Sequence, residues 1–344
     1  MKYNKKELQS ALSAVTPLTG KTGIMACVKF ADGTLSAFDN DIAVSYKIDT
    51  DENYCVSGKD LLTTIKNFPD GEIELEITDK SVKIKSEKLK GKYKLPILSA
   101  DDFPAFDDHT GTEFTMTGLN SAIKKIAYSA SADTIKPVFN GIHYDGSHLV
   151  ATDSRRLSVA RTGEVAGEGI SIIMPLRFTV EMRRLFGDDI TLRVSDNMIT
   201  AYNDTIVLSS RLVDGKFPNW KQVIPAKSTH NIEIDVAQLR STISRIVGYA
   251  NAPAFRLTFE LAGNDMKISA SNDGGGNAEE VVTFGGDACE IKFALNGAYL
   301  LETLANVSGD VVQCGLTAPM SPVVFSCGDE KHVIMPIQIK EVEK

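Results

Sequence analysis

An internal repeat constrains this chain more than any other feature of its sequence. Three stretches, 61–77, 179–194 and 300–316, share one order: an amphipathic helical pattern, a glycine, an acidic residue and then alternating apolar residues. The glycines Gly71, Gly187 and Gly309 stand 116 and 122 residues apart. A glycine is typical of a helix C-terminus, and the alternation that follows it predicts a half-buried strand.

Two more markers recur with nearly the same period. An earlier amphipathic helix and a strand that runs into a polar turn each occur three times, aligned at Leu8, Leu119 and Leu239 and at Ala37, Ala151 and Ala270. Agreement of independent markers predicts copies of one domain. We therefore predict an α+β protein of three repeated domains, at residues 1–112, 113–229 and 230–344, each with two helices packed on antiparallel sheets.

The composition excludes several classes of protein. No apolar run approaches the ~18 residues of a membrane-spanning helix, and the N-terminus has no signal-peptide pattern, so we expect a cytoplasmic protein. The five cysteines are scattered without a Cys-x-x-Cys pair, and the five histidines are dispersed. We therefore predict no disulfide framework, no metal site and no cofactor.

The charge is distributed unevenly. The net charge is −8, yet the six predicted helices, 5–21, 57–67, 119–136, 175–185, 235–247 and 296–306, hold 13 basic and 6 acidic residues. Helix surfaces are often rich in lysine and arginine, but glutamate is an equally good helix former, so propensity does not explain the sign. A basic helical surface would attract a polyanion. Its expected carriers, which would face such a polyanion, for example DNA, are Lys5, Lys6, Lys66, Lys124, Lys125, Lys136, Arg177, Arg183, Arg184, Arg240 and Arg245.

The segment "ATDSRRLSVA" (151–160) raises an alternative, an enzyme acting on nucleic acid with Asp153, Arg155 and Arg156 as a catalytic cluster. Such a site needs further carboxylates or a histidine around it, and no constellation of that kind has a recognisable spacing here. The equivalent segments of the other repeats are "SAFDNDIAVS" and "SASNDGGGNA", so the fold supplies a strand and a polar turn. We predict no catalytic residues. The segment "LTGKTG" lacks the first glycine and the following helix of a phosphate-binding loop.

Four segments in order, 151–160, 209–225, 293–304 and 333–339, closely resemble the bacterial sliding clamps, the β subunits of DNA polymerase III. The resemblance implies the DNA clamp fold, in which each chain forms half of a closed ring. It implies a non-catalytic processivity factor, a head-to-tail homodimer that encircles duplex DNA of any sequence. Its expected partners are the replicative polymerase, the clamp-loader ATPase and repair proteins, which bind through short apolar peptides; no membrane is expected.

The resemblance also implies two protein-binding sites. A peptide-binding pocket between the second and third domains would comprise Phe139, Thr152, Ser154, Arg155, Arg156, Leu157, Pro218, Gln222, Val223, Asn296, Tyr299, Met320, Pro322, Val333, Ile334, Met335, Pro336 and Ile337, with Arg156 at its rim. The dimer interface would include Phe103, Phe106, Ile246 and Val247. Four features depart from the family pattern and leave the peptide preference open: Ser154-Arg155, Gln222, Gln338 and the tail Lys340–Lys344. A chromosomal origin and a phage or mobile-element origin both stay open.

Overall fold

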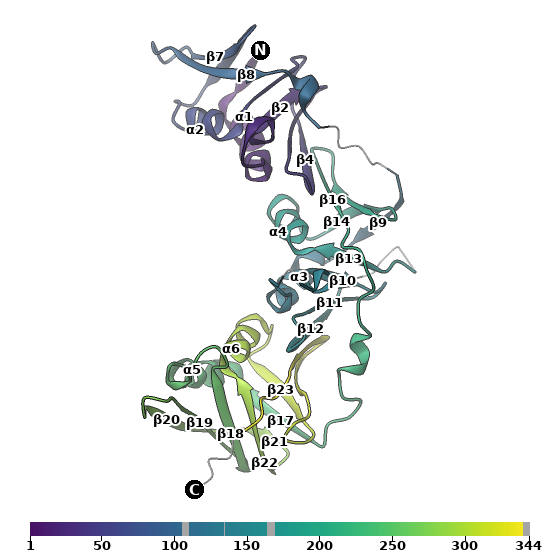
Figure 1. The fold of residues 1–344 in the computed structure, drawn as a ribbon, viewed down its shortest axis with the longest axis vertical. Coiled ribbons are helices and arrows are strands. Elements are labelled where there is room, and N and C mark those ends of the chain that lie inside the picture. Colours follow the sequence, from purple (N-terminus) through teal and green to yellow (C-terminus); the bar gives the residue numbers. More distant parts are fainter. Residues whose placement is uncertain (105–109, 134, 164–168, 340–344) are drawn as a thin grey trace. The chain divides into compact units, whose positions relative to one another are not determined.

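A computed structural model of the chain describes residues 1–104, 110–133, 135–163 and 169–339. The chain forms two compact units (Figure 1). Residues 1–116 and 177–212 make the first unit, and residues 117–176 and 213 onward make the second. Among the described residues, no helix is long and apolar enough to cross a membrane.

One antiparallel sheet of twelve strands organises the first unit. Its helices are α1 (Lys5–Val15), α2 (Gly58–Lys66) and all but the first residue of α4 (Leu176–Leu185). In spatial order its strands are β1 (Lys2–Asn4), β6 (Glu72–Thr78), β7 (Ser81–Ser86), β8 (Tyr93–Leu98), β5 (Tyr54–Ser57), β2 (Cys27–Ala31), β3 (Thr34–Phe38), β4 (Ile42–Lys47), β16 (Ile206–Arg211), β15 (Met198–Tyr202), β14 (Ile190–Val194) and β9 (Thr112–Met116).

The second unit has two antiparallel sheets and the helices α3 (Leu119–Ile126), α5 (Val236–Ile246) and α6 (Gly297–Asn306). In order, the larger sheet is β13 (Ile172–Pro175), β10 (Gly141–Tyr144), β11 (His148–Thr152), β12 (Arg156–Arg161), β25 (Glu330–Ile334), β24 (Val323–Cys327), β23 (Val311–Leu316), β17 (His230–Asp235) and β21 (Gly285–Gly286). The smaller sheet is β20 (Asn277–Thr283), β19 (Asp265–Ser271), β18 (Arg256–Gly263) and β22 (Cys289–Asn296).

All six predicted helices are present, but two end earlier than predicted. Helix α1 stops at Val15 and continues only as a 3₁₀ turn, because Pro17 has no N–H for the i→i−4 ladder. Helix α3 stops at Ile126 and is followed by a 3₁₀ turn, in which Ser129 Oγ lies 2.7 Å from Ser158 Oγ of β12. Side-chain caps begin several of the helices; Asp235, for example, accepts a hydrogen bond from the Gln238 N–H at the start of α5.

The repeat is visible in the order of elements. Each copy has a first strand, a helix, four strands, a second helix and three more strands: β1 to β8, β9 to β16, and β17 to β25 with the short β21 added. Strand β4 of the first copy pairs with β16 of the second, and β12 of the second copy pairs with β25 of the third. Because each end of the second copy joins a neighbour's sheet, its elements are divided between the two compact units.

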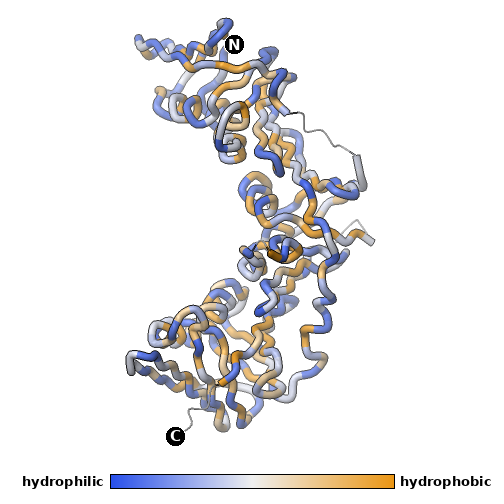
Figure 2. Tube along the Cα trace, in the orientation of Figure 1, coloured by the Kyte–Doolittle hydropathy of each residue, from blue (hydrophilic) through white to orange (hydrophobic). Residues whose placement is uncertain are grey.

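An extensive core cluster of the second unit belongs to the third copy. Leu239 and Ile243 of α5 and Leu300 of α6 are buried against the strands, where the rings of Phe259 and Phe293 stack 5.1 Å apart. Apolar and polar residues alternate along many of the strands (Figure 2). This alternation buries one face of each sheet, and each buried leucine or phenylalanine contributes about 1.5–3 kcal/mol.

Candidate functional site

A largely apolar pocket of about 210 Å³ lies in the second unit. Its floor comes from β12 and β25, which pair through Leu157 and Val333. One wall comes from segment 217–223, which contains a short 3₁₀ helix, Trp220–Gln222. The lining residues are Phe139, Thr152, Ser154, Arg156, Leu157, Phe217, Pro218, Trp220, Val223, Val333 and Met335.

Nine of the residues that the sequence predicted for the pocket line it. Phe217 and Trp220 also line it and were missed by the sequence analysis, although the pair of aromatic residues in "KFPNW" marks the segment. The other nine predicted residues do not line it: Arg155, Gln222, Asn296, Tyr299, Met320, Pro322, Ile334, Pro336 and Ile337. Of these, Ile334 is fully buried in the core and Asn296 caps helix α6, whereas Met320 is exposed.

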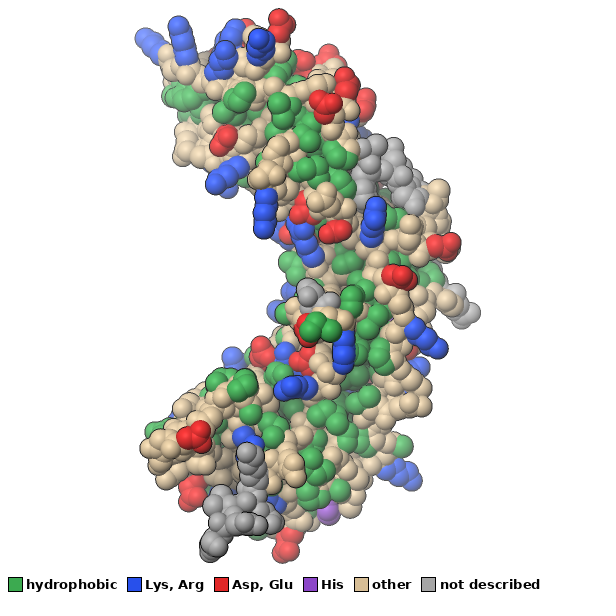
Figure 3. Space-filling model, in the orientation of Figure 1, with side chains coloured by type: hydrophobic (Ala, Val, Ile, Leu, Met, Phe, Trp, Pro, Cys, Tyr) green, Lys and Arg blue, Asp and Glu red, His purple; other side chains and the backbone are tan. Residues whose placement is uncertain are grey.

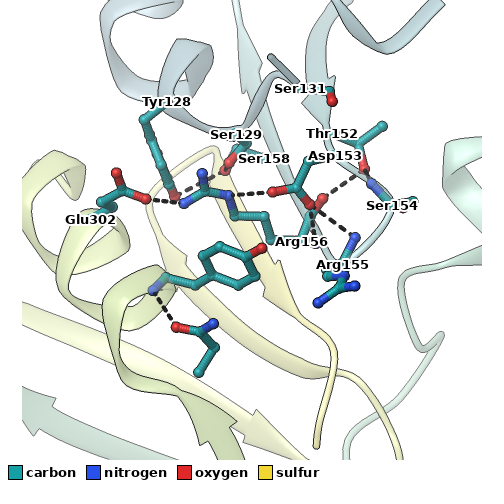
Figure 4. A network of polar contacts seen from close by, with 12 residues as sticks. Tyr128, Ser129, Ser131, Thr152, Asp153, Ser154, Arg155, Arg156, Ser158 and Glu302 are labelled. Atoms are coloured by element: carbon teal, nitrogen blue, oxygen red, sulfur yellow. Dashed lines mark hydrogen bonds and ion pairs between the residues drawn. The ribbon is translucent and has the colours of Figure 1, made fainter. Parts of the chain in front are cut away.

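A tight turn forms the lip of the pocket (Figure 4). Asp153 Oδ1 accepts hydrogen bonds from the N–H groups of Arg155 and Arg156, at 2.9 and 3.0 Å. The Thr152 hydroxyl donates to the Arg156 carbonyl at 2.6 Å and accepts from the Ser154 N–H at 3.1 Å. These bonds hold Ser154 at a φ of +75°, a left-handed conformation that costs a non-glycine residue about 1–2 kcal/mol.

Arg156 is buried rather than free at the rim, where it was predicted. Its guanidinium pairs with Asp153 at 3.0 Å and with Glu302 of α6 (Figure 4). The guanidinium carbon also lies 4.4 Å from the ring centre of Tyr299 and 5.2 Å from that of Tyr128. Only 9% of the residue is exposed, because its partners come from both the second and the third repeat. Arg156 therefore joins the two repeats, with its charge balanced by carboxylates.

A second buried polar cluster lies beside this arginine. His332 of β25 is fully buried, and its Nδ1 lies 3.0 Å from the Tyr128 hydroxyl and 2.9 Å from Ser158 Oγ. Lys125 of α3 reaches Glu330 Oε1 at 2.6 Å. Burial alone would raise the pKa of Glu330, but the nearby His332 imidazole, the ion pair with Lys125 and the hydrogen bond from Ser308 outweigh it and lower the pKa to about 2. The cluster thus contains an ionised carboxylate, that of Glu330 on β25, which pairs with Lys125 of α3.

In the cluster of Asp153, Arg155 and Arg156, the polar groups are engaged in contacts that stabilise the turn. Both oxygens of Asp153 serve the turn and the ion pair with Arg156, and Arg156 has Glu302 as a second partner. Within the described residues, no group of three or more histidine, cysteine, aspartate or glutamate side chains is arranged to hold a metal ion. This geometry is that of a structural turn.

The predicted DNA-facing cations fall into two groups; the side chains of one face of the molecule are drawn in Figure 3. One group already has carboxylate partners in ion pairs: Lys5 with Asp70, Lys125 with Glu330, Arg177 with Asp39, Arg184 with Glu181 and Arg245 with Glu280. For the described residues, no ion pair is formed by the other six: Lys6, Lys66, Lys124, Lys136, Arg183 and Arg240. Within the described residues, the charges of this second group are not balanced by a carboxylate in an ion pair.

The residues predicted for the dimer interface are mostly buried in their own domains. Ile246 is 1% exposed and Phe103 is 8% exposed, whereas Val247 is half-buried. Phe106 lies outside the described residues. Exposed apolar side chains lie on β8, on β20 and after α5: Tyr93 and Leu98, Val281, and Tyr249. This set was not found from sequence, because exposure depends on which strands have neighbours.

Comparison with known proteins covers nearly the whole chain. Family models of the DNA polymerase III beta subunit match three stretches: the N-terminal domain at residues 7–107, the central domain at 113–219 and the C-terminal domain at 221–338. The beta sliding clamp of Escherichia coli is 27% identical over 338 residues, 91% of either chain. That of Synechococcus elongatus is 27% identical over 305 residues, 82% of this chain and 79% of the relative.

Solved structures agree on the fold. The sliding clamp of Pseudomonas aeruginosa bound to griselimycin superposes with a TM-score of 0.91 at 22% identity, over 98% of this chain and 99% of that one. The clamp of Bacillus subtilis gives 0.89 at 18% identity, with the same coverage. The predicted α+β clamp fold is thus confirmed. Because three models of one family together match almost the entire length, the chain belongs to the family of the bacterial DNA polymerase III β subunit, the β sliding clamp.

Proposed function

We propose that the chain is a DNA sliding clamp: two copies close head to tail into a ring around duplex DNA and tether DNA-processing proteins. The observation that carries this proposal is the threefold repeat, in which the last strand of one copy pairs with the fourth strand of its neighbour. We place the domain boundaries near residues 112 and 229, as the repeat spacing predicts, and the protein in the cytoplasm. A ring holds DNA by topology, so its phosphate contacts can be weak and exchangeable.

The repeat also supports a location for ring closure. Strand β20 is the third copy's equivalent of β4 and β12, and in the described part of the chain it pairs only with β19. Strand β8 is the first copy's equivalent of β16 and β25, and its residues 93–96 pair only with β7. We infer that β20 of one subunit pairs with β8 of the other. Such a heterologous contact forms a ring if the rotation closes.

Charge complementarity supports the same contact. The exposed lysines Lys92 and Lys94 lie at the start of β8, and the exposed Glu279 lies on β20. Apolar side chains at both edges, with Val281 60% exposed, would be covered by the pairing. An unpaired strand edge is a template for another strand, and the opposite charges favour this one.

We propose the apolar pocket as the docking site for partner peptides. Its lining is mainly apolar and aromatic with a few polar groups, as expected for a groove that takes short apolar peptides. The proposed partners are the replicative polymerase, the clamp loader and repair proteins. In this proposal the protein performs no catalysis, since the charged turn at 152–156 serves the pocket's structure.

Retention on DNA tests the ring. The clamp, loaded on nicked circular plasmid DNA by a clamp loader, is expected to stay bound during gel filtration. It is expected to dissociate once a restriction enzyme linearises the plasmid, because the ring then slides off the ends. Equal retention on circular and linear DNA would contradict the proposal.

The free cations on the helices are expected to set the salt dependence of DNA binding. Replacing Lys124 and Arg240 by methionine should lower the slope of log affinity against log salt by about 0.9 for each phosphate that is no longer neutralised. Fluorescence anisotropy with a labelled linear duplex measures the slope. Replacing the exposed Lys227 and Lys331 by methionine changes the net charge equally and is the matched control. If both pairs of substitutions change the slope equally, the helices do not form the DNA interface.

A further inference from the structure

Side chains, rather than backbone hydrogen bonds, attach the wall segment 217–223 to the rest of the second unit. The backbone hydrogen bonds described for it, Gln222 N–H to the Asn219 carbonyl and Val223 N–H to the Trp220 carbonyl, stay inside the segment. The position of the wall, and with it the shape of the pocket, therefore depends on what its side chains touch.

Those side chains rest on the hairpin of β10 and β11. The ring of Phe217 stacks on His143, with centres 4.5 Å apart and planes 13° apart. Trp220 meets His148 edge to face at 5.2 Å. Lys221 Nζ lies 3.4 Å from Asp145 Oδ2, in the turn between the two strands. We call His143, Asp145 and His148 the histidine platform.

His143 is held as a neutral imidazole. It is 8% exposed, and its Nδ1 lies 3.1 Å from the Ile172 carbonyl, which can only accept, so Nδ1 carries the proton. Burial lowers the pKa of His143, although the Ile172 carbonyl and the charge of Asp145 oppose the effect. A second proton would place a charge on a buried ring that stacks against Phe217.

His148 is held in place by the neighbours of its two ring nitrogens. Arg161 Nε–H donates to His148 Nε2 at 3.3 Å, and a guanidinium can only donate, so Nε2 carries no proton. The other nitrogen, Nδ1, lies 2.7 Å from Ser147 Oγ and 3.3 Å from Asp145 Oδ1. These contacts fix the ring that meets Trp220.

Asp145 stays charged while His143 titrates. Burial alone would raise its pKa, but the backbone N–H groups of His148 and Ser147, the charge of His148 and the hydrogen bond from Lys221 lower it to about 2. The charged groups that face the platform are thus Asp145, Arg161 and Lys221. Of these groups, Asp145 is the one whose charge favours a protonated histidine.

We propose that His143 and His148 are positioning residues of the pocket: their rings hold Phe217 and Trp220 in the wall, and protonation of His143 loosens the wall and weakens peptide binding. The proposal rests on the proposed function of the pocket. Because the folded state favours neutral His143, the support that this ring gives to the wall is complete above about pH 6.5. It is lost as the pH falls through the lowered pKa of His143. Peptide affinity should therefore decrease on acidification.

Calorimetric titration tests the proposal with an acetylated, amidated pentapeptide of glutamine, leucine and phenylalanine, which has no titratable group. The Kd of the full-length wild-type protein is expected to rise about tenfold from pH 7.5 to pH 5.0, a weakening of about 1.4 kcal/mol. The double variant His143→Phe/His148→Gln, which keeps an aromatic ring under Phe217, should show a ratio near one. His230→Gln, on β17, is the control and should keep the wild-type ratio. A flat wild-type profile, or an unchanged ratio in the double variant, overturns the proposal.

Fluorescence tests the platform without any peptide, because Trp220 is the single tryptophan of the chain. Protonation of His143 should loosen the wall and so change the Trp220 emission between pH 7.5 and pH 5.0 in the wild type, and should leave it constant in His143→Phe. An identical change of the emission in both proteins overturns the proposed role of the histidine platform. If the peptide fails to bind at pH 7.5 while the emission behaves as expected, the proposed pocket function fails and the platform stands.

Discussion

Replacing Val281 with lysine is expected to convert the dimer into monomers. Val281 is 60% exposed on β20, whose outer edge we assign to the partner's β8, near the exposed lysines Lys92 and Lys94. A buried like-charge contact costs several kcal/mol, so the dimer Kd should rise about a hundredfold or more. Sedimentation velocity over a range of protein concentrations measures this change, and circular dichroism checks that the variant is folded.

Val311→Lys is the matched control for this substitution. Val311 is an exposed strand valine as well, but β23 has neighbours on both edges, β17 and β24. The control should remain a dimer. Adding Lys94→Glu to Val281→Lys should recover part of the affinity, because it replaces the repulsion by an opposite-charge pair. If Val281→Lys leaves the dimer Kd unchanged, β20 does not take part in ring closure.

Much of the fold could be predicted from local pattern. The helical periodicity around Leu8, Leu119 and Leu239 located the first helix of each copy, and the strand alternation located the sheets. The ends of two helices could not be predicted as easily. The pattern at the start of the chain continues past Val15, and the missing N–H of Pro17 ends the α-helix there.

The site was harder to predict, because its charges find partners far away in the sequence. The turn at 152–156 could be predicted from its aspartate and serine, which favour such turns. The burial of Arg156 could not, because Glu302 and Tyr299 lie more than 140 residues away. For the same reason, a helical lysine such as Lys125 looks free in the sequence, although it pairs with Glu330 in the fold.

Replacing Lys125 by methionine is expected to destabilise the second unit strongly. Methionine keeps most of the length of the side chain but leaves Glu330, 4% exposed, without its cation. Breaking a buried ion pair in this way costs about 3–5 kcal/mol, and because the Lys125 side chain is 34% exposed we expect at most about 3 kcal/mol here. Urea unfolding followed by circular dichroism measures the loss. The same substitution at Lys124, the exposed neighbour, should change stability by less than about 0.5 kcal/mol.

A double variant separates the ion pair from mere packing. In Lys125→Met/Glu330→Gln no buried charge remains, so most of the lost stability should return. The wild type should also lose stability in acid: the pKa of Glu330, about 2 when folded against a usual 4.5, stabilises the fold by about 3 kcal/mol above pH 4.5. That contribution should vanish as the pH falls towards 2. The double variant lacks the Glu330 carboxylate, so its loss of stability in acid should be smaller by the same amount. The losses of stability in Lys125→Met alone and in Glu330→Gln alone are compared with the loss in the double variant. If the two single losses add up to the double loss, Lys125 and Glu330 act independently, and Lys125 remains a candidate for DNA contact, as the sequence predicted.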